Sequence, residues 1–212
     1  MKVYVKHFKP NPMIEELITQ LAQVVNSQNG RIYTNTNLRF NPDVCHAACI
    51  WFQHVLAENP IEEAVNKLAQ LDKNTLFVSQ KEATANPKII HETIKNARDK
   101  GYLTDGDIEA LTYLYNNWKQ PDAYSDNTNE VAQGLVASIT NNEANKLLFM
   151  ISNKDENHVI CISNKSGEII IYDPNIGVIV LSENDLNTAT GLIVMILQWY
   201  AREMKLNQFA FN

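Results

Sequence analysis

Three residues of this 212-residue chain have the types and the order that thiol chemistry on a carbonyl group requires: Cys45, His158 and Asp173. Cys45 follows the polar segment 41–44 and precedes an apolar run, so it should lie in the first turn of a helix. Backbone N–H groups and the helix dipole at such a position stabilise a thiolate, which is the nucleophilic form of cysteine. Taken alone, Cys45 fits a buried structural cysteine better, because free cysteines are among the most buried residues.

His158 and Asp173 each have an ordinary explanation, and their relation makes them candidates. His158 begins an apolar run and alone fits a histidine at a strand edge, whereas Asp173 lies in Asp-Pro-Asn-Ile-Gly, which is typical of a turn. Fifteen residues separate the two, on two expected strands joined by the turn 164–167. Antiparallel neighbours bring such residues to one end of a sheet. An aspartate there accepts the imidazole N–H and orients the ring toward a thiolate.

The elements expected around these residues indicate an α+β fold. Apolar residues at helical spacing, followed by short β-rich runs between polar turns, place the helices first and an antiparallel meander afterwards. Residues 31–44 are polar and read as irregular. The expected helices are 13–25, 43–57, 61–71, 87–100, 104–118 and one that begins at Ser182; the expected strands are 147–152, 158–163, 168–173, 177–181 and 209–211.

The composition limits the classes of function. The chain is 45% hydrophobic, enough for a substantial core, and its net charge of -6 argues against non-specific binding of nucleic acid. Three cysteines make a poor disulfide framework and fit a reducing compartment. The N-terminus lacks the apolar core of a cleaved signal peptide, and the most apolar later window, 192–197, is too short for a bilayer. We therefore expect a soluble protein that is not exported through a cleaved signal peptide.

A metal or cofactor site is not expected. Cys45 and Cys49 share a helix face, but a zinc site would need two further ligands, and no second Cys/His cluster exists. No glycine-rich phosphate loop is present among the seven glycines. Cys49 is better explained as a core residue. Cys161 lies three residues after His158, so it should point to the opposite face of that strand and also belong to the core.

The sequence around the three candidates resembles the YopT-like cysteine proteases, papain-fold effectors that bacteria inject into host cells. The resemblance rests on the helix-start Cys45, on His-Val-Ile-Cys-Ile at 158–162 and on Ile-Tyr-Asp-Pro-Asn-Ile-Gly at 171–177. The tail is similar too, with a helix that ends in Trp199-Tyr200 before a short final strand. The resemblance covers these elements and residues 147–212, whereas residues 60–140 match nothing. Around the nucleophile the chain departs from the family, because Val44 replaces a common glycine and His46 follows the cysteine.

The resemblance implies a fold, a mechanism and a setting. It implies a single papain-like domain over residues 1–212, with a family-variable helical portion at about 60–140. His158 would take the proton of Cys45, and the thiolate would attack a carbonyl to form a thioester that water resolves. The oxyanion would be held by the Cys45 backbone N–H and the Asn41 side chain, with Asn37 behind it. The protein would reach the host cell cytoplasm through a specialised secretion system. It would act there as a monomer on a host protein, which for the family is a small GTPase.

Three alternatives stay open. The same three residues support deamidation of Asn or Gln side chains on a host protein, and acyl transfer to an amine differs only in what resolves the thioester. The chain could also be a protease-fold binding module without activity.

The aromatic segment 113–124 is either a helix end packed into the core or part of a substrate surface.

Overall fold

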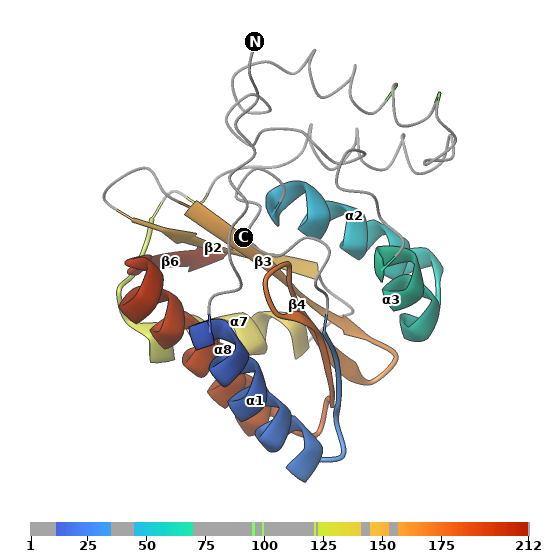
Figure 1. Ribbon diagram of the computed structural model, residues 1–212, viewed down its shortest axis with the longest axis horizontal. Helices are drawn as coiled ribbons and strands as arrows, with labels where there is room; N and C mark the ends of the chain where they lie inside the picture. Colours follow the sequence, from blue (N-terminus) through green and yellow to red (C-terminus); the bar gives the residue numbers. More distant parts are fainter. Residues whose placement is uncertain are drawn as a thin grey trace.

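The computed structural model of the chain describes residues 12–34, 45–69, 95, 99, 121, 123–140, 145–152 and 157–211 (Figure 1). Several predictions fall on residues outside these ranges. They are the helix 104–118, nearly all of the helix 87–100, most of the aromatic segment (residues 113–120), and the oxyanion candidates Asn37 and Asn41. In the part of the chain that is described, no helix is long and apolar enough to cross a membrane.

An antiparallel sheet of six strands forms the centre of the described structure. Its order is β1-β5-β4-β3-β2-β6, and each neighbouring pair is antiparallel. Strands β2 to β5 follow one another in both chain and space, which confirms the predicted meander and the α+β class. The bounds are β1 Arg31–Thr34, β2 Asn145–Ile151, β3 Asn157–Lys165, β4 Glu168–Asp173, β5 Gly177–Ser182 and β6 Gln208–Phe211.

Helices cover both faces of this sheet (Figure 1). One face packs against α2 and α3, and the other against α1, α7 and α8. Helix α8 continues into a π-helical turn, η1, before the chain returns to the sheet as β6. The bounds are α1 Pro12–Ser27, α2 Cys45–Glu58, α3 Ile61–Ala69, α7 Thr128–Thr140, α8 Leu186–Trp199 and η1 Tyr200–Met204.

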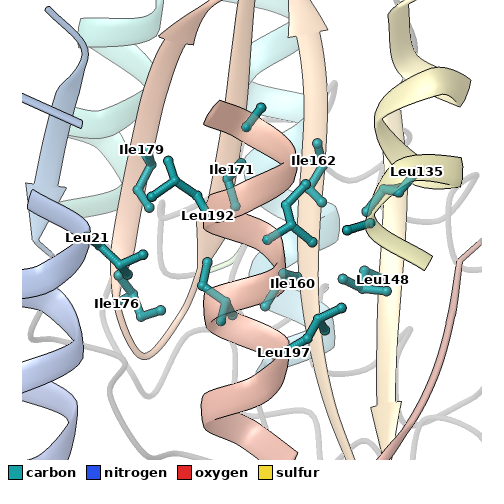
Figure 2. Close-up of a cluster of buried hydrophobic side chains, with 14 of the residues drawn as sticks. Leu21, Leu135, Leu148, Ile160, Ile162, Ile171, Ile176, Ile179, Leu192 and Leu197 are labelled. Carbon is teal, nitrogen blue, oxygen red and sulfur yellow. The ribbon is translucent and has the colours of Figure 1, made fainter. Parts of the chain in front are cut away.

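Alternate residues of each central strand enter two different cores. In β3, Val159 and Cys161 join the core under α2, whereas Ile160 and Ile162 join the core under α8. This follows from the pleat, which turns successive side chains to opposite faces. Figure 2 shows the second core, with Leu192 and Leu197 of α8 among the strand isoleucines. Burial on both faces explains the unbroken apolar run Ile169–Ile171.

Several predicted elements differ from the observed ones. Strand β1 lies in the segment predicted to be irregular, and α7 has no counterpart among the predicted elements. The helix predicted from Ser182 was wrong in its start: Ser182 is the last residue of β5, and α8 begins at Leu186. Asp185 is the N-cap residue of α8, but its side chain makes no capping hydrogen bond.

Candidate active site

Helix α2 carries the candidate nucleophile at its first residue, Cys45, as predicted. Side-chain hydrogen bonds hold this helix on the sheet at several points. The Cys49 thiol donates to the backbone carbonyl of Val159 at 3.3 Å, and the Gln53 side chain donates to that of Lys146 at 3.0 Å. Lys165 donates to carbonyls at the C-terminal end of α2. The Cys45 end of the helix is therefore fixed relative to β3.

His158 and Asp173 come from adjacent strands, β3 and β4, which a two-residue turn connects. Ser166 and Gly167 both have positive φ (53° and 80°), as a type I′ hairpin turn requires. His158 precedes Ile160 by two residues and Asp173 follows Ile171 by two, so both have the strand parity of the core under α8. His158 Nε2 lies 3.0 Å from Asp173 Oδ1. The predicted juxtaposition of these residues on the sheet is confirmed.

Asp173 also builds the turn between β4 and β5. Its Oδ1 accepts the backbone N–H of Asn175 at 2.8 Å, and its backbone carbonyl accepts that of Ile176 at 3.0 Å. These bonds are typical of an aspartate that opens a turn. The turn holds the carboxylate in a fixed orientation, with only 1% of the residue exposed. Asp173 is therefore a turn residue, as its ordinary explanation predicted, and its carboxylate is also the hydrogen-bond partner of the His158 ring.

The structure brings Cys45 to His158. The Cys45 side chain hydrogen-bonds to the ring and, with Asp173, favours its protonated form. Burial lowers the pKa of His158, but the charge and the hydrogen bond of Asp173, followed by Cys45, raise it to about 10. The ring is thus an imidazolium at neutral pH. Cys45, the first residue of α2, therefore lies beside a cation.

The other histidine beside the nucleophile is in the opposite electrostatic state. His46 is buried against Phe149, in an edge contact with ring centroids 6.2 Å apart. Burial lowers the pKa of His46 to about 4, so its ring is neutral at pH 7. The two histidines are therefore distinguished by charge, and His158 is the one suited to pair with a thiolate.

Cys49 and Cys161 are core residues, as predicted. Both belong to the core under α2 and are buried. Burial, followed by a hydrogen bond and the charge of Cys161, raises the pKa of the Cys49 thiol well above its usual value. Cys49 thus stays a protonated thiol. No cluster of three or more His, Cys, Asp or Glu side chains that could hold a metal ion occurs among the described residues.

Two further side chains belong to this site and were not predicted from the sequence. The Tyr200 hydroxyl contacts both His158 and Asp173, and the Asn175 side chain donates to that hydroxyl at 2.8 Å. In the sequence, Trp199-Tyr200 is only the end of the tail helix that resembles the family. The available signal for Asn175 was its place two residues after Asp173. The oxyanion residue predicted from the resemblance, Asn41, lies outside the described residues.

The arrangement of these elements occurs in a solved structure. The fold is similar to that of AvrPphB. The comparison with the crystal structure of this Pseudomonas avirulence protein gives a TM-score of 0.52 and covers 84% of this chain and 94% of that one, at 13% sequence identity. AvrPphB is a papain-like cysteine protease effector of the YopT family. The fold predicted from the sequence resemblance, papain-like α+β, is therefore confirmed.

Sequence comparison adds no further relative. No model of a protein family matches the chain, and no curated protein matches its sequence. The similarity to AvrPphB is thus one of fold, detected through the arrangement of helices and strands.

Proposed function

We propose that this protein is a papain-like cysteine protease that acts on a host protein as a secreted bacterial effector. The observation that carries the proposal is the chain of contacts from the Cys45 thiol to the His158 ring and from there to the Asp173 carboxylate. A nucleophile, a base and a group that orients the base are thereby in contact, as covalent catalysis requires. The AvrPphB-like fold supports the effector setting.

The reaction follows from these contacts. In the resting pair the proton of Cys45 is already on the His158 ring, and the Cys45 Sγ thiolate forms a bond to the substrate carbonyl carbon, whose π electrons move to the oxygen. When the tetrahedral intermediate collapses, the C–N bond breaks and the imidazolium proton goes to the leaving amine. Water, deprotonated by His158, then attacks the thioester, and the C–S bond breaks. The products are an amine and a carboxylic acid, and the thiol is restored.

The thiol chemistry is tested by alkylation with iodoacetamide at neutral pH. Cys45, Cys49 and Cys161 are 1%, 0% and 1% exposed, so their static exposure does not distinguish them. We expect Cys45 to be labelled far faster, because it pairs with an imidazolium. Peptide mass spectrometry of a time course gives the rate at each site. Equal, slow labelling of all three thiols would exclude the enzyme and leave an inert binding module.

The reaction type is tested with proteins of a eukaryotic cell lysate. We expect the wild-type protein, but not Cys45→Ala, to generate new protein N-termini that terminal-peptide mass spectrometry detects. Deamidation would leave chains intact and replace an amide NH2 by OH, and acyl transfer would join an amine to a side-chain carbonyl. Either of these products without new N-termini would replace the protease proposal by the corresponding amide chemistry on the same thiol.

A further inference from the structure

The Tyr200 hydroxyl lies at the centre of the hydrogen bonds around His158 and Asp173. Its oxygen is 2.9 Å from His158 Nε2, 3.1 Å from Asp173 Oδ1 and 2.9 Å from Asp173 Oδ2. Asn175 Nδ2 lies 2.8 Å from the same oxygen. Tyr200 is 1% exposed, so these bonds form away from solvent. Buried polar groups with satisfied partners restrict each other's orientation.

The chemistry of these groups allows one consistent assignment of the hydrogens. Burial, followed by the charge of Asp173, raises the pKa of Tyr200 well above its usual value, so the phenol keeps its proton. A carboxylate only accepts, so the single hydroxyl hydrogen goes to Asp173. The hydroxyl oxygen then accepts from Asn175 Nδ2 and from His158. It follows that Nε2 of His158 carries hydrogen in the neutral as well as in the charged ring.

This assignment leaves Nδ1 as the ring nitrogen that exchanges the proton with Cys45. The plane of the imidazole is also restricted, because the Tyr200 ring stacks on it at a centroid distance of 4.7 Å and an angle of 28°. One residue thus contacts the face of the ring with its own ring and Nε2 with its hydroxyl.

The backbone of Tyr200 is held equally firmly. Its N–H bonds to the carbonyls of Ile196 and Leu197 at the end of α8. Its carbonyl accepts the N–H groups of Lys205 and Leu206 at the other end of the π-helical turn η1. Single π-helical turns are frequent at functional sites. Here the turn begins at the residue that touches both His158 and Asp173.

We propose that Tyr200 is a positioning residue of the active site, whose hydroxyl and ring fix the tautomer and the plane of His158 so that Nδ1 faces Cys45. The catalytic consequence of this proposal rests on the proposed thiol function. The positioning itself does not, because it is a property of the imidazole that can be observed without any substrate.

The experiment compares Tyr200→Phe with Trp199→Phe. Tyr200→Phe keeps the stacked ring and removes only the hydroxyl. Trp199→Phe is the matched control, because Trp199 is its neighbour, is 4% exposed and packs edge-on against Tyr200 at 5.1 Å. Among the described residues its indole N–H has no hydrogen-bond partner, so the control removes packing but no hydrogen bond.

Two readouts are measured in both variants and in the wild type. The first is the proton NMR signal of His158 Nε2–H in protein labelled with ¹⁵N-histidine, assigned by its loss in His158→Gln. The second is the rate of Cys45 alkylation by iodoacetamide. We expect Tyr200→Phe to broaden the signal through faster exchange with water and to slow alkylation about tenfold, because a misplaced ring transfers protons less well. Trp199→Phe should keep both at the wild-type level.

The remaining outcomes are decisive too. A sharp, unshifted signal in Tyr200→Phe with unchanged alkylation would overturn the proposal, and so would equal broadening in the two variants, which indicates general loosening. If Tyr200→Phe does not fold, Asn175→Ala takes its place, because it removes a hydrogen-bond donor to the Tyr200 hydroxyl. An unchanged His158 signal in Asn175→Ala would also overturn the proposal. If wild-type Cys45 is not labelled selectively, the proposed function fails, while the NMR signal still decides the role of Tyr200.

Discussion

Asp173 combines a structural and an electrostatic role in a single carboxylate. Its Oδ1 holds the turn through the Asn175 N–H and also lies 3.0 Å from the imidazole. Its charge contributes to the raised pKa of His158. Because the turn fixes the carboxylate, the charge that His158 experiences is fixed as well. The geometry of the turn therefore sets the protonation state of the histidine.

Asp173→Asn should separate these roles, because asparagine keeps the shape and the turn but not the charge. We expect the pKa of His158 to fall from about 10, since burial alone lowers it. Cys45 alkylation at pH 7 should slow by about 10²–10⁴-fold, the usual contribution of a positioned acid–base group. A histidine NMR titration and the labelling rate measure the two effects. Asp185→Asn is the control, because the Asp185 side chain makes no capping hydrogen bond. If the pKa of His158 were the same in Asp173→Asn as in the wild type, the assigned role of the Asp173 charge would be wrong.

The sequence predicts those site residues that lie close together along the chain. The interval between His158 and Asp173 spans one hairpin, so strand and turn chemistry suffices to place them together. Tyr200 could not be predicted as their partner, because its contact depends on how α8 packs across the sheet. The parity of His158 with Ile160 and Ile162 points to that face, but no local pattern selects the aromatic residue that meets it.

Helix α2 depends at its C-terminal end on a lysine from the sheet. Lys165 Nζ donates to the carbonyls of Leu56, Ala57 and Asn59, at 3.3 Å and 2.9 Å for the last two. The last carbonyls of a helix have no partner within it, and they carry the negative end of its dipole. The Lys165 ammonium group therefore satisfies the free carbonyls at the C-terminal end of α2, the end farthest from Cys45.

Lys165→Met should lower the free energy of unfolding by about 1.5–3 kcal/mol, the range for hydrogen bonds to a charged group. Urea denaturation measures this loss. The alkylation rate of Cys45 should not change, because the nucleophile lies at the opposite end of α2. Lys205→Met is the matched control: Lys205 also donates to a backbone carbonyl, of Arg202 at 2.7 Å, but at an exposed position. We expect its effect to stay within about 0.5 kcal/mol; an equal loss in both variants would refute the assignment.

The elements that escaped prediction did so for different reasons. Strand β1 is four residues long and only partly buried, and it pairs with β5, far along the chain, so its own sequence carries little signal. Helix α7 was predictable, because Val131, Leu135 and Ile139 recur every four residues. Asn127 also accepts the backbone N–H of Glu130, as an N-terminal cap does. The start of α8 was misplaced because β5 extends through Ser182.

The whole described structure is a sheet covered on both faces, and such a fold can be similar to that of AvrPphB at only 13% sequence identity. The two cores require apolar side chains in alternation, not particular ones. The sequence resemblance covers the helix start at Cys45 and residues 147–212, whereas the similarity of fold covers 84% of the chain.

The two histidines near Cys45 should give the protein a stability maximum near pH 6.5. The pKa of His158 is raised, so the native state holds a proton that the unfolded state releases above about pH 6.5, and stability falls as the pH rises toward 10. The pKa of His46 is lowered to about 4, so the unfolded state binds a proton that the native state refuses, and stability falls as the pH decreases from 6.5 to 4.

Urea denaturation across this range measures the two slopes. We expect the loss on the acid side from His46 to reach roughly 3 kcal/mol at pH 4. His46→Leu should flatten the acid side relative to wild type, and Asp173→Asn the alkaline side. If either variant follows the wild-type curve throughout, the corresponding histidine does not titrate as described.

The order of the elements along the chain has a consequence for timing. Residue 45 leaves the ribosome long before the strands that carry His158 and Asp173, and the bond from Cys49 to Val159 spans 110 residues. The β3–β4 hairpin closes over a two-residue turn, whereas docking α2 onto it must close a much longer loop. During synthesis Cys45 is therefore an ordinary thiol. The contacts of Cys45 with His158 and of His158 with Asp173 therefore form only after β3 and β4 have been made, so a nascent chain cannot carry out the proposed thiol chemistry before that point.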